Sequence, residues 1–80
     1  MQGKDSWLTI GALAQRAGVA TSAVRFYEAQ GLLRGSRSEG NQRRYAKETL
    51  RRVAFIRIAQ GVGLSLADVR AALATLPEQR

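Results

Sequence analysis

Two short helical segments joined by a very tight turn constrain this chain more than any other feature of its sequence. The first segment, TIGALAQRAG, spans residues 9–18. Its apolar residues recur at the spacing of one helical face, and they are Ile10, Leu13, Ala14 and Ala17. Thr9 can cap the start of this helix, and Gly18 suits the left-handed residue that ends one.

A second candidate helix, TSAVRFYEAQG, begins after only Val19 and Ala20. We expect Thr21 or Ser22 to cap its start and Gly31 to end it. Two helices joined by such a short, glycine-containing turn form the helix-turn-helix pattern, whose second helix can lie in the major groove of DNA. The pattern therefore indicates a nucleic-acid-binding domain.

The second helix is expected to have a buried and an exposed face. With Val24 at the centre of the buried face and about 100° per residue, Ala20 and Tyr27 fall near it. The opposite arc holds Ser22, Arg25, Phe26 and Ala29. A hydroxyl, a guanidinium, a ring and a methyl group suit base edges and thymine methyls. Tyr27 lies at the boundary, where its hydroxyl can reach a phosphate, unless both Tyr27 and Phe26 are core aromatics.

A turn-rich segment, RGSRSEGNQRRY, follows the second helix. It predicts a two-stranded hairpin, or wing, with Gly40 and Asn41 at positions that tolerate a positive φ. Neighbouring strand residues point to opposite faces, so Arg43 and Tyr45 should face the core side and Arg44 the other side. We expect Arg43 or Arg44 to bind phosphate through its guanidinium, with Tyr45 packed beneath as an anchor.

The third candidate helix, near KETLRRVAFIRIAQG, is apolar on two sides. One stripe is Leu50, Val53 and Ile56, and the other is Phe55, Ile58 and Ala59. One side should meet the helix-turn-helix, and the other should meet either the fourth helix or a partner chain. Arg51 and Arg52 lie between the stripes, where they add phosphate contacts or remain solvated. Ala46 stands where a cap is expected, so this helix can start late.

The fourth candidate helix begins at SLAD. The Ser65 side chain can cap its start, and the Asp68 side chain can bond back to the capping residue, as in a capping box. Its apolar stripe is Leu66, Val69, Leu73 and Leu76. Pro77 should end it, because proline cannot continue a helix.

One domain is expected in a chain of 80 residues. We expect a mostly α, winged helix-turn-helix domain at residues 8–76, with about four helices and a small two-stranded β-hairpin wing. Residues 1–7 would be an N-terminal tail and residues 77–80 a short C-terminal end. No apolar run approaches the length of a membrane span, and the first residues lack a signal peptide, so we expect a cytoplasmic protein.

This sequence has few of the residue types and motifs that catalysis requires. Cysteine and histidine are absent, which excludes disulfides, thiolate metal sites and the commonest general base. The carboxylates, Glu28 among them, are scattered without close pairing, and there is no glycine-rich phosphate loop. We therefore expect no enzyme, no catalytic residue, no metal and no cofactor.

The whole chain has a net charge of +7, and most of the positive charge is concentrated in one segment. The basic residues between positions 34 and 57 are Arg34, Arg37, Arg43, Arg44, Lys47, Arg51, Arg52 and Arg57. Only Glu39 and Glu48 oppose them there. Such a patch favours a polyanion such as nucleic acid or an anionic membrane surface, although a basic face kept for solubility is the plain alternative.

Four motifs in order resemble those of a known family. VRFYEAQGLL, GNQRRY, FIRIAQGVG and LSLADVRAAL are similar to the amino-terminal DNA-binding domain of the MerR family of bacterial regulators, from about Leu8 to Leu76. GNQRRY, and IAQ before a glycine-rich turn, look most like the SoxR-like, redox-sensing branch. The residues that match the family signatures are Arg25, Phe26 and Tyr27 in the recognition helix and Arg43, Arg44 and Tyr45 in the wing.

The resemblance implies dimers that bend and untwist a promoter so that RNA polymerase engages both promoter boxes. The family's long dimerisation helix and effector-sensing tail are not in this sequence, nor are the cysteines that hold the iron-sulfur cluster of the redox-sensing branch. We therefore expect a separated domain that binds double-stranded DNA and forms at most a weakened homodimer. The candidate DNA-binding residues are Ser22, Arg25, Phe26, Tyr27, Arg43, Arg44 and Tyr45.

Two other functions stay open at this point. One is a stand-alone, excisionase-like architectural DNA-binding protein of the same fold. The other is a protein-interaction module such as an antitoxin or adaptor, with the second apolar face of the third helix as its binding site. RNA is less favoured, because the aromatic motifs of an RNA-recognition sheet are absent.

Overall fold

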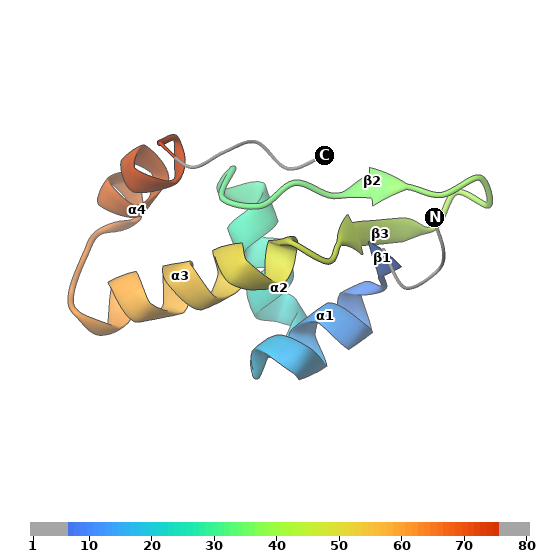
Figure 1. The fold of residues 1–80 in the computed structure, drawn as a ribbon, viewed down its shortest axis with the longest axis horizontal. Helices are drawn as coiled ribbons and strands as arrows, with labels where there is room; N and C mark the ends of the chain where they lie inside the picture. The colour runs from blue at the N-terminus through green and yellow to red at the C-terminus, as the bar shows by residue number, and fades with distance from the viewer. Residues whose placement is uncertain (1–6, 76–80) are drawn as a thin grey trace.

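The computed structural model describes residues 7–75, in which helices and a small antiparallel sheet share one core (Figure 1). The elements in chain order are β1 (Trp7–Leu8), α1 (Ile10–Ala17), α2 (Thr21–Ala29), β2 (Ser36–Arg37), β3 (Arg43–Ala46), α3 (Thr49–Gly61) and α4 (Leu66–Leu73). This arrangement confirms the predicted mostly helical, winged helix-turn-helix class. Within the described part of the chain, no helix is long and apolar enough to cross a membrane.

Helix α1 starts and ends at the predicted residues. The Thr9 hydroxyl accepts a hydrogen bond from the backbone N–H of Ala12 at 3.1 Å, which satisfies one of the free donors of the first turn. Gly18 takes a left-handed conformation with φ of 75°, and its N–H donates to carbonyls of the last turn. A side chain at Gly18 would be strained, so this glycine fixes the sharp turn into α2.

The N-cap position of helix α2 lies before the residues that were predicted to cap it. It starts at Thr21, and its capping position is held by Ala20, which has no side chain to accept a hydrogen bond. The expectation that Thr21 or Ser22 caps this helix is therefore wrong, because both lie inside its first turn. Gly31, with φ of 79°, does end α2 as predicted.

The sheet has three strands rather than two, in the order β1-β3-β2. The predicted hairpin is confirmed: β2 and β3 pair antiparallel with Ser36 opposite Arg44, and we call this hairpin the wing. Strand β1 pairs with the other edge of β3, with Leu8 opposite Tyr45. Trp7, assigned above to a tail, is part of this strand. The third strand ties the start of the chain to the wing.

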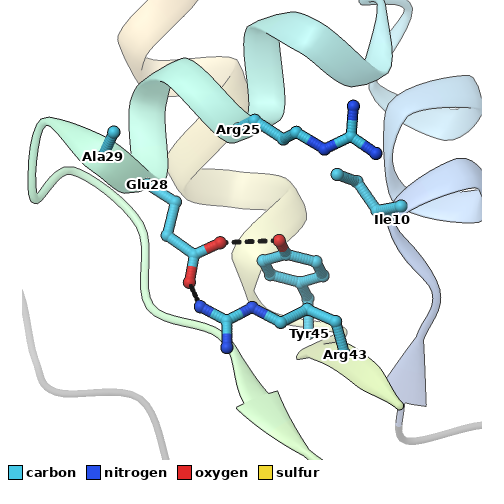
Figure 2. Close-up of a pocket in the computed structure, with 6 residues that line it drawn as sticks. All are labelled: Ile10, Arg25, Glu28, Ala29, Arg43 and Tyr45. Carbon is cyan, nitrogen blue, oxygen red and sulfur yellow. Dashed lines mark hydrogen bonds and ion pairs between the residues drawn. The ribbon is translucent and has the colours of Figure 1, made fainter.

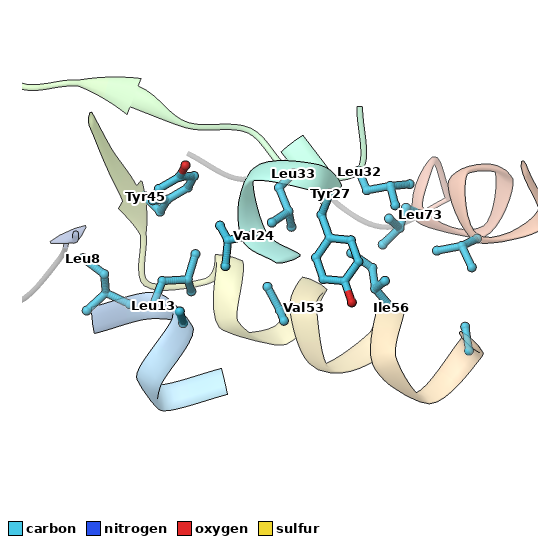
Figure 3. Packing of buried hydrophobic residues seen from close by; sticks show 13 residues of the cluster. Leu8, Leu13, Val24, Tyr27, Leu32, Leu33, Tyr45, Val53, Ile56 and Leu73 are labelled. Atoms are coloured by element: carbon cyan, nitrogen blue, oxygen red, sulfur yellow. The ribbon is translucent and has the colours of Figure 1, made fainter. Parts of the chain in front are cut away.

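One hydrophobic core joins the four helices and the sheet (Figure 3). Its fully buried side chains are Leu13, Val24, Leu32, Tyr45, Val53, Ile56 and Val69, and the polar Thr49 is fully buried as well. Helix α3 packs against both α1 and α4, so it is the central element of the domain. It starts at Thr49 without a side-chain cap, which confirms the late start predicted from Ala46.

The second apolar stripe of α3 is buried less than predicted. Ala59 belongs to the core and Phe55 is half-buried, but Ile58 is 67% exposed. Within residues 7–75, α4 therefore does not cover this side of α3, and the alternative of a partner chain stays a prediction. Figure 1 shows that the chain turns back after α3, so that α4 lies over the C-terminal part of α3 only.

Helix α4 begins as its sequence predicts. The Ser65 hydroxyl accepts a hydrogen bond from the N–H of Asp68 at 3.1 Å. Val69 and Leu73 are buried in the core. The predicted end of the stripe and the proline after it, at residues 76 and 77, lie outside the described residues.

Two isoleucines on α3 provide a matched test of this packing. We expect Ile56→Ala, at a fully buried position, to lower the free energy of unfolding by about 2–5 kcal/mol, because it leaves a cavity. Ile58→Ala, at a position 67% exposed, should change it by no more than about 0.5 kcal/mol. Urea unfolding measures both values. Equal losses at the two positions would contradict the orientation of α3.

Candidate nucleic-acid interface

Helix α2 presents the side chains that its sequence pattern predicts. Val24 and Tyr27 are buried in the core. The exposed arc carries Ser22, Arg25, Phe26 and Ala29. Phe26 is 46% exposed, so the alternative that it is a core aromatic is wrong. An exposed phenyl ring beside a guanidinium is an arrangement that suits stacking and hydrogen bonding to a ligand with flat, polar edges.

Tyr27 supports α2 from inside the domain. Its ring is buried, and its hydroxyl donates a hydrogen bond to Oε1 of Gln60 on α3 at 3.3 Å. The ring of Phe26 lies 6.2 Å from that of Tyr27 between centroids, at an interplanar angle of 59°. Tyr27 therefore fixes the register of α2 against α3, and a phosphate contact from its hydroxyl stays a prediction.

Glu28, in the last turn of α2, connects this helix to the wing (Figure 2). One of its carboxylate oxygens accepts a hydrogen bond from the Tyr45 hydroxyl at 2.7 Å. The other accepts one from the Arg43 guanidinium in an ion pair. Arg43 and Tyr45 therefore share one face of β3, as the alternation along the strand predicted. Sequence reasoning counted Glu28 only as one of several scattered carboxylates.

Protonation of this cluster follows from its contacts. Burial first, and then the hydrogen bond to Glu28, raises the pKa of Tyr45 above its ordinary value of 10.0. The hydrogen bond to the carboxylate also raises the pKa of Arg43. Tyr45 is therefore a neutral hydrogen-bond donor, and Arg43 is a permanent cation whose charge is balanced by Glu28.

Arg44 lies on the opposite face of β3, again as predicted. Its guanidinium carbon is 3.9 Å from the centroid of the Trp7 ring, which is a cation–π contact. Its Nε is 3.5 Å from the Ser36 hydroxyl on β2. An aromatic ring holds this side chain without neutralising it, so Arg44 keeps the charge that an anion would meet. The role of Trp7 was missed because a two-residue strand leaves no periodic pattern.

A hollow of about 410 Å³ lies between α1, α2 and β3. Its lining residues are Ile10, Arg25, Glu28, Ala29, Arg43 and Tyr45. Arg25 from α2 and Arg43 from the wing therefore line the same concave surface, with their guanidinium groups on different sides of it. Among residues 7–75, no three acidic side chains lie close enough together to hold a metal ion. The chemistry of this surface suits an anion.

Two other arginines are used inside the domain. Arg57 donates to the carbonyl of Ala17, the last residue of α1, at 3.0 Å. Arg70 donates twice to the carbonyl of Gln30, just after α2, at 2.7 and 3.1 Å. A cation at the C-terminal end of a helix is favourable, so each helix of the helix-turn-helix is capped by a later helix. Arg57, counted above in the basic segment, is thus engaged by the protein.

The sequence pattern described as "MerR HTH family regulatory protein" matches residues 8–76. The chain belongs to this family. The predicted resemblance to MerR regulators and to their SoxR-like branch is confirmed by curated relatives. A protein of Chromobacterium violaceum named "HTH-type transcriptional activator SoxR homolog" is 56% identical over 77 residues, which are 96% of this chain and 52% of that protein.

More distant MerR relatives agree with this assignment. The mercuric resistance operon regulatory protein of Shigella flexneri is 43% identical over 63 residues, which are 78% of this chain and 44% of that protein. The chain thus spans about half the length of the curated relatives it matches. The names of these relatives are those of transcriptional regulators.

Solved structures of MerR regulators share this fold. HiNmlR, described as a MerR family regulator lacking the sensor domain, bound to promoter DNA, is 26% identical with a TM-score of 0.77 over 85% of this chain and 52% of its own. A transcription regulator of Ralstonia metallidurans CH34 in complex with lead(II) is 40% identical with a TM-score of 0.78. That match covers 84% of this chain and 53% of the other.

The raised pKa of Tyr45 predicts an alkaline loss of stability. Because the folded pKa lies above the ordinary 10.0, the stabilisation is complete below pH 10.0 and is lost as the pH rises toward the folded value. Urea unfolding across this range should show the fall in the wild type and a smaller fall in Tyr45→Phe, which has no group to ionise there. An identical pH dependence in the two proteins would contradict the burial and bonding of this hydroxyl.

Proposed function

We propose that this domain binds double-stranded DNA with sequence preference, as the DNA-binding part of a MerR-family transcription regulator. Helix α2 lies in the major groove, and the wing follows the neighbouring phosphate backbone. The observation that carries the proposal is the concave surface that Arg25 of α2 and Arg43 of the wing both line. The promoter-bound state of the related HiNmlR supports it.

The exposed arc of α2 reads the bases in this proposal. Ser22 and Arg25 donate hydrogen bonds to base edges, and the Arg25 fork suits the two acceptors of a guanine. Phe26, which is 46% exposed, contacts thymine methyls or sugars. Tyr27 holds the helix in place through Gln60, and a phosphate contact would require its hydroxyl to leave this bond.

The wing supplies the backbone contacts. Arg44 binds phosphate directly, because no carboxylate among residues 7–75 pairs with it and its guanidinium is already held on the Trp7 ring. Arg43 lies on the opposite face of β3 with a side chain that is 41% exposed, so it joins this contact only where a strong twist of the wing brings both faces to the backbone. Tyr45 is buried on the same face of β3 as Arg43, where it anchors the strand to the core.

The longer relatives suggest how such a domain is used. We propose that two copies, joined by chain outside this sequence, bind the two half-sites of a pseudo-palindromic promoter in the bacterial cytoplasm. Two-fold symmetry in the protein requires two-fold symmetry in its site. Distorting the DNA between the half-sites costs several kcal/mol, which backbone contacts from both wings offset. The distortion would bring both promoter boxes within reach of RNA polymerase.

One observation favours a second, protein-binding role. Ile58 is 67% exposed and lines a groove of about 550 Å³ between α1 and α3. The rim of the groove carries Arg16 and Arg57. If the domain works only as a protein-interaction module, Ile58→Glu abolishes partner binding, and the domain binds DNA no better than a generic basic peptide does.

Salt dependence separates a phosphate contact from a general charge effect. We expect Arg44→Ala to reduce the magnitude of the log–log salt slope of DNA binding by about one, since one counterion-releasing contact is lost. Fluorescence anisotropy of a labelled duplex at several salt concentrations measures the slope.

Arg16→Ala is the matched control for this experiment. It removes the same charge from the groove between α1 and α3, away from the wing. Its slope should equal that of the wild type. If Arg44→Ala also keeps the wild-type slope, or if Arg16→Ala lowers it by as much, Arg44 does not lie on phosphate.

A further inference from the structure

An acidic residue lies in the middle of the surface that is proposed to meet DNA. Glu28 belongs to the recognition helix and lines the hollow between that helix and the wing. A negative charge beside DNA repels phosphate, so removing one ordinarily raises affinity. Glu28 should therefore make another contribution to DNA binding that is larger than the repulsion between its charge and the phosphates.

Both oxygens of Glu28 are occupied by the wing. Oε1 accepts from the Tyr45 hydroxyl at 2.7 Å, and Oε2 accepts from the Arg43 guanidinium. Figure 2 shows the two partners on one face of β3, with the carboxylate of α2 directed at them. The Glu28 side chain is only 18% exposed, so water competes little for these bonds.

The loop between α2 and the wing closes over the same cluster. A Cβ built at Gly35 would lie 3.0 Å from Oε2 of Glu28, 3.0 Å from the Tyr45 ring and 3.1 Å from Nε of Arg43. These distances are tighter than ordinary contacts, so the backbone passes here without room for a side chain. Three segments of the chain therefore pack together around one carboxylate.

Apart from the pairing of β1 with β3 and the packing of α1 on β3, few described contacts fix the direction of the wing. Strand β2 has two residues, both exposed, and a lone hairpin of this size is marginal in water. On β3 only Tyr45 is fully buried. The bonds to Glu28 act just where the hairpin joins the core, so they set its angle to α2.

We propose that Glu28 is a positioning residue for DNA binding: its carboxylate fixes the wing relative to the recognition helix so that both reach the duplex together. This inference rests on the proposed function. Ordering the wing in advance removes a cost that binding would otherwise carry. Glu28 therefore strengthens DNA binding although it carries the same sign of charge as the phosphates.

The sign of one mutational effect tests this inference. Glu28→Ala should weaken binding about tenfold, since the wing must then be ordered on the DNA. Glu39→Ala is the matched control, because it removes the same charge from an exposed position in the wing. Its affinity should equal or exceed that of the wild type. The probe is the duplex that the wild-type domain enriches most from a randomised pool.

Two further variants separate positioning from simple stability. Glu28→Gln keeps an acceptor for the Tyr45 hydroxyl but loses the ion pair, so its affinity should lie between those of the wild type and Glu28→Ala. Tyr45→Phe keeps the buried ring and the net charge but loses one bond, and should weaken binding about threefold. Circular dichroism and urea unfolding establish that each variant is folded at the assay temperature. A residue that only stabilises the fold leaves the affinity of a fully folded variant unchanged.

The outcomes distinguish the two proposals. If the wild type enriches a duplex and the folded Glu28 variants bind it as tightly or more tightly, Glu28 merely balances Arg43, and the positioning role is wrong while the proposed function stands. If the wild type enriches no duplex and shows no salt-dependent binding, the proposed function fails, and the positioning role falls with it.

Discussion

The carboxylate of Glu28 is the polar contact that joins the recognition helix of this small domain to its wing. It joins the last turn of α2 to Arg43 and Tyr45 of β3, two residues that reach it only because strand alternation puts them on one face. A chain of 80 residues buries a single modest core, and Tyr45 is the one fully buried residue that β3 contributes to it. Pairing with β1 and the directional polar bonds to Glu28 add to this packing at the base of the wing.

The positive charge of the chain is divided among different tasks. Arg57 and Arg70 cap the helix-turn-helix from α3 and α4, and Arg43 is paired with Glu28. Arg44 is held on Trp7 and Arg25 on the exposed arc of α2, where neither is balanced by a described carboxylate contact. A net charge of +7 thus overstates how many cations are available to a ligand.

Local signals in the sequence predicted local structure well. Thr9 and Ser65 each cap the helix that follows, because a hydroxyl at that position has one nearby donor to satisfy. The exposed arc of α2 and the two faces of β3 followed from periodicity alone. The start of α2 was misplaced, since Thr21 and Ser22 are good caps by residue type and only the backbone shows that Ala20 holds that position.

Contacts between distant segments could not be read from the sequence. Arg57 and Arg70 each bind a carbonyl 40 residues away, and no local pattern marks such a partner. Glu28 lies 15 and 17 residues from its partners, and a lone acid in a basic chain resembles any solvated charge. The exposed side of α3 shows the opposite error: an apolar stripe predicts burial, yet Ile58 is left in solvent within the described chain.

The central claim is that α2 and the wing form one DNA-binding surface, and nuclear magnetic resonance tests it most directly. Titrating the isotopically labelled domain with its selected duplex should shift the amide signals of residues 21–29 and 36–46 together, with one dissociation constant. Signals of residues 66–73 in α4 should move little. Shifts concentrated around Ile58 and Val62 on α3, or different dissociation constants for α2 and the wing, would contradict the account.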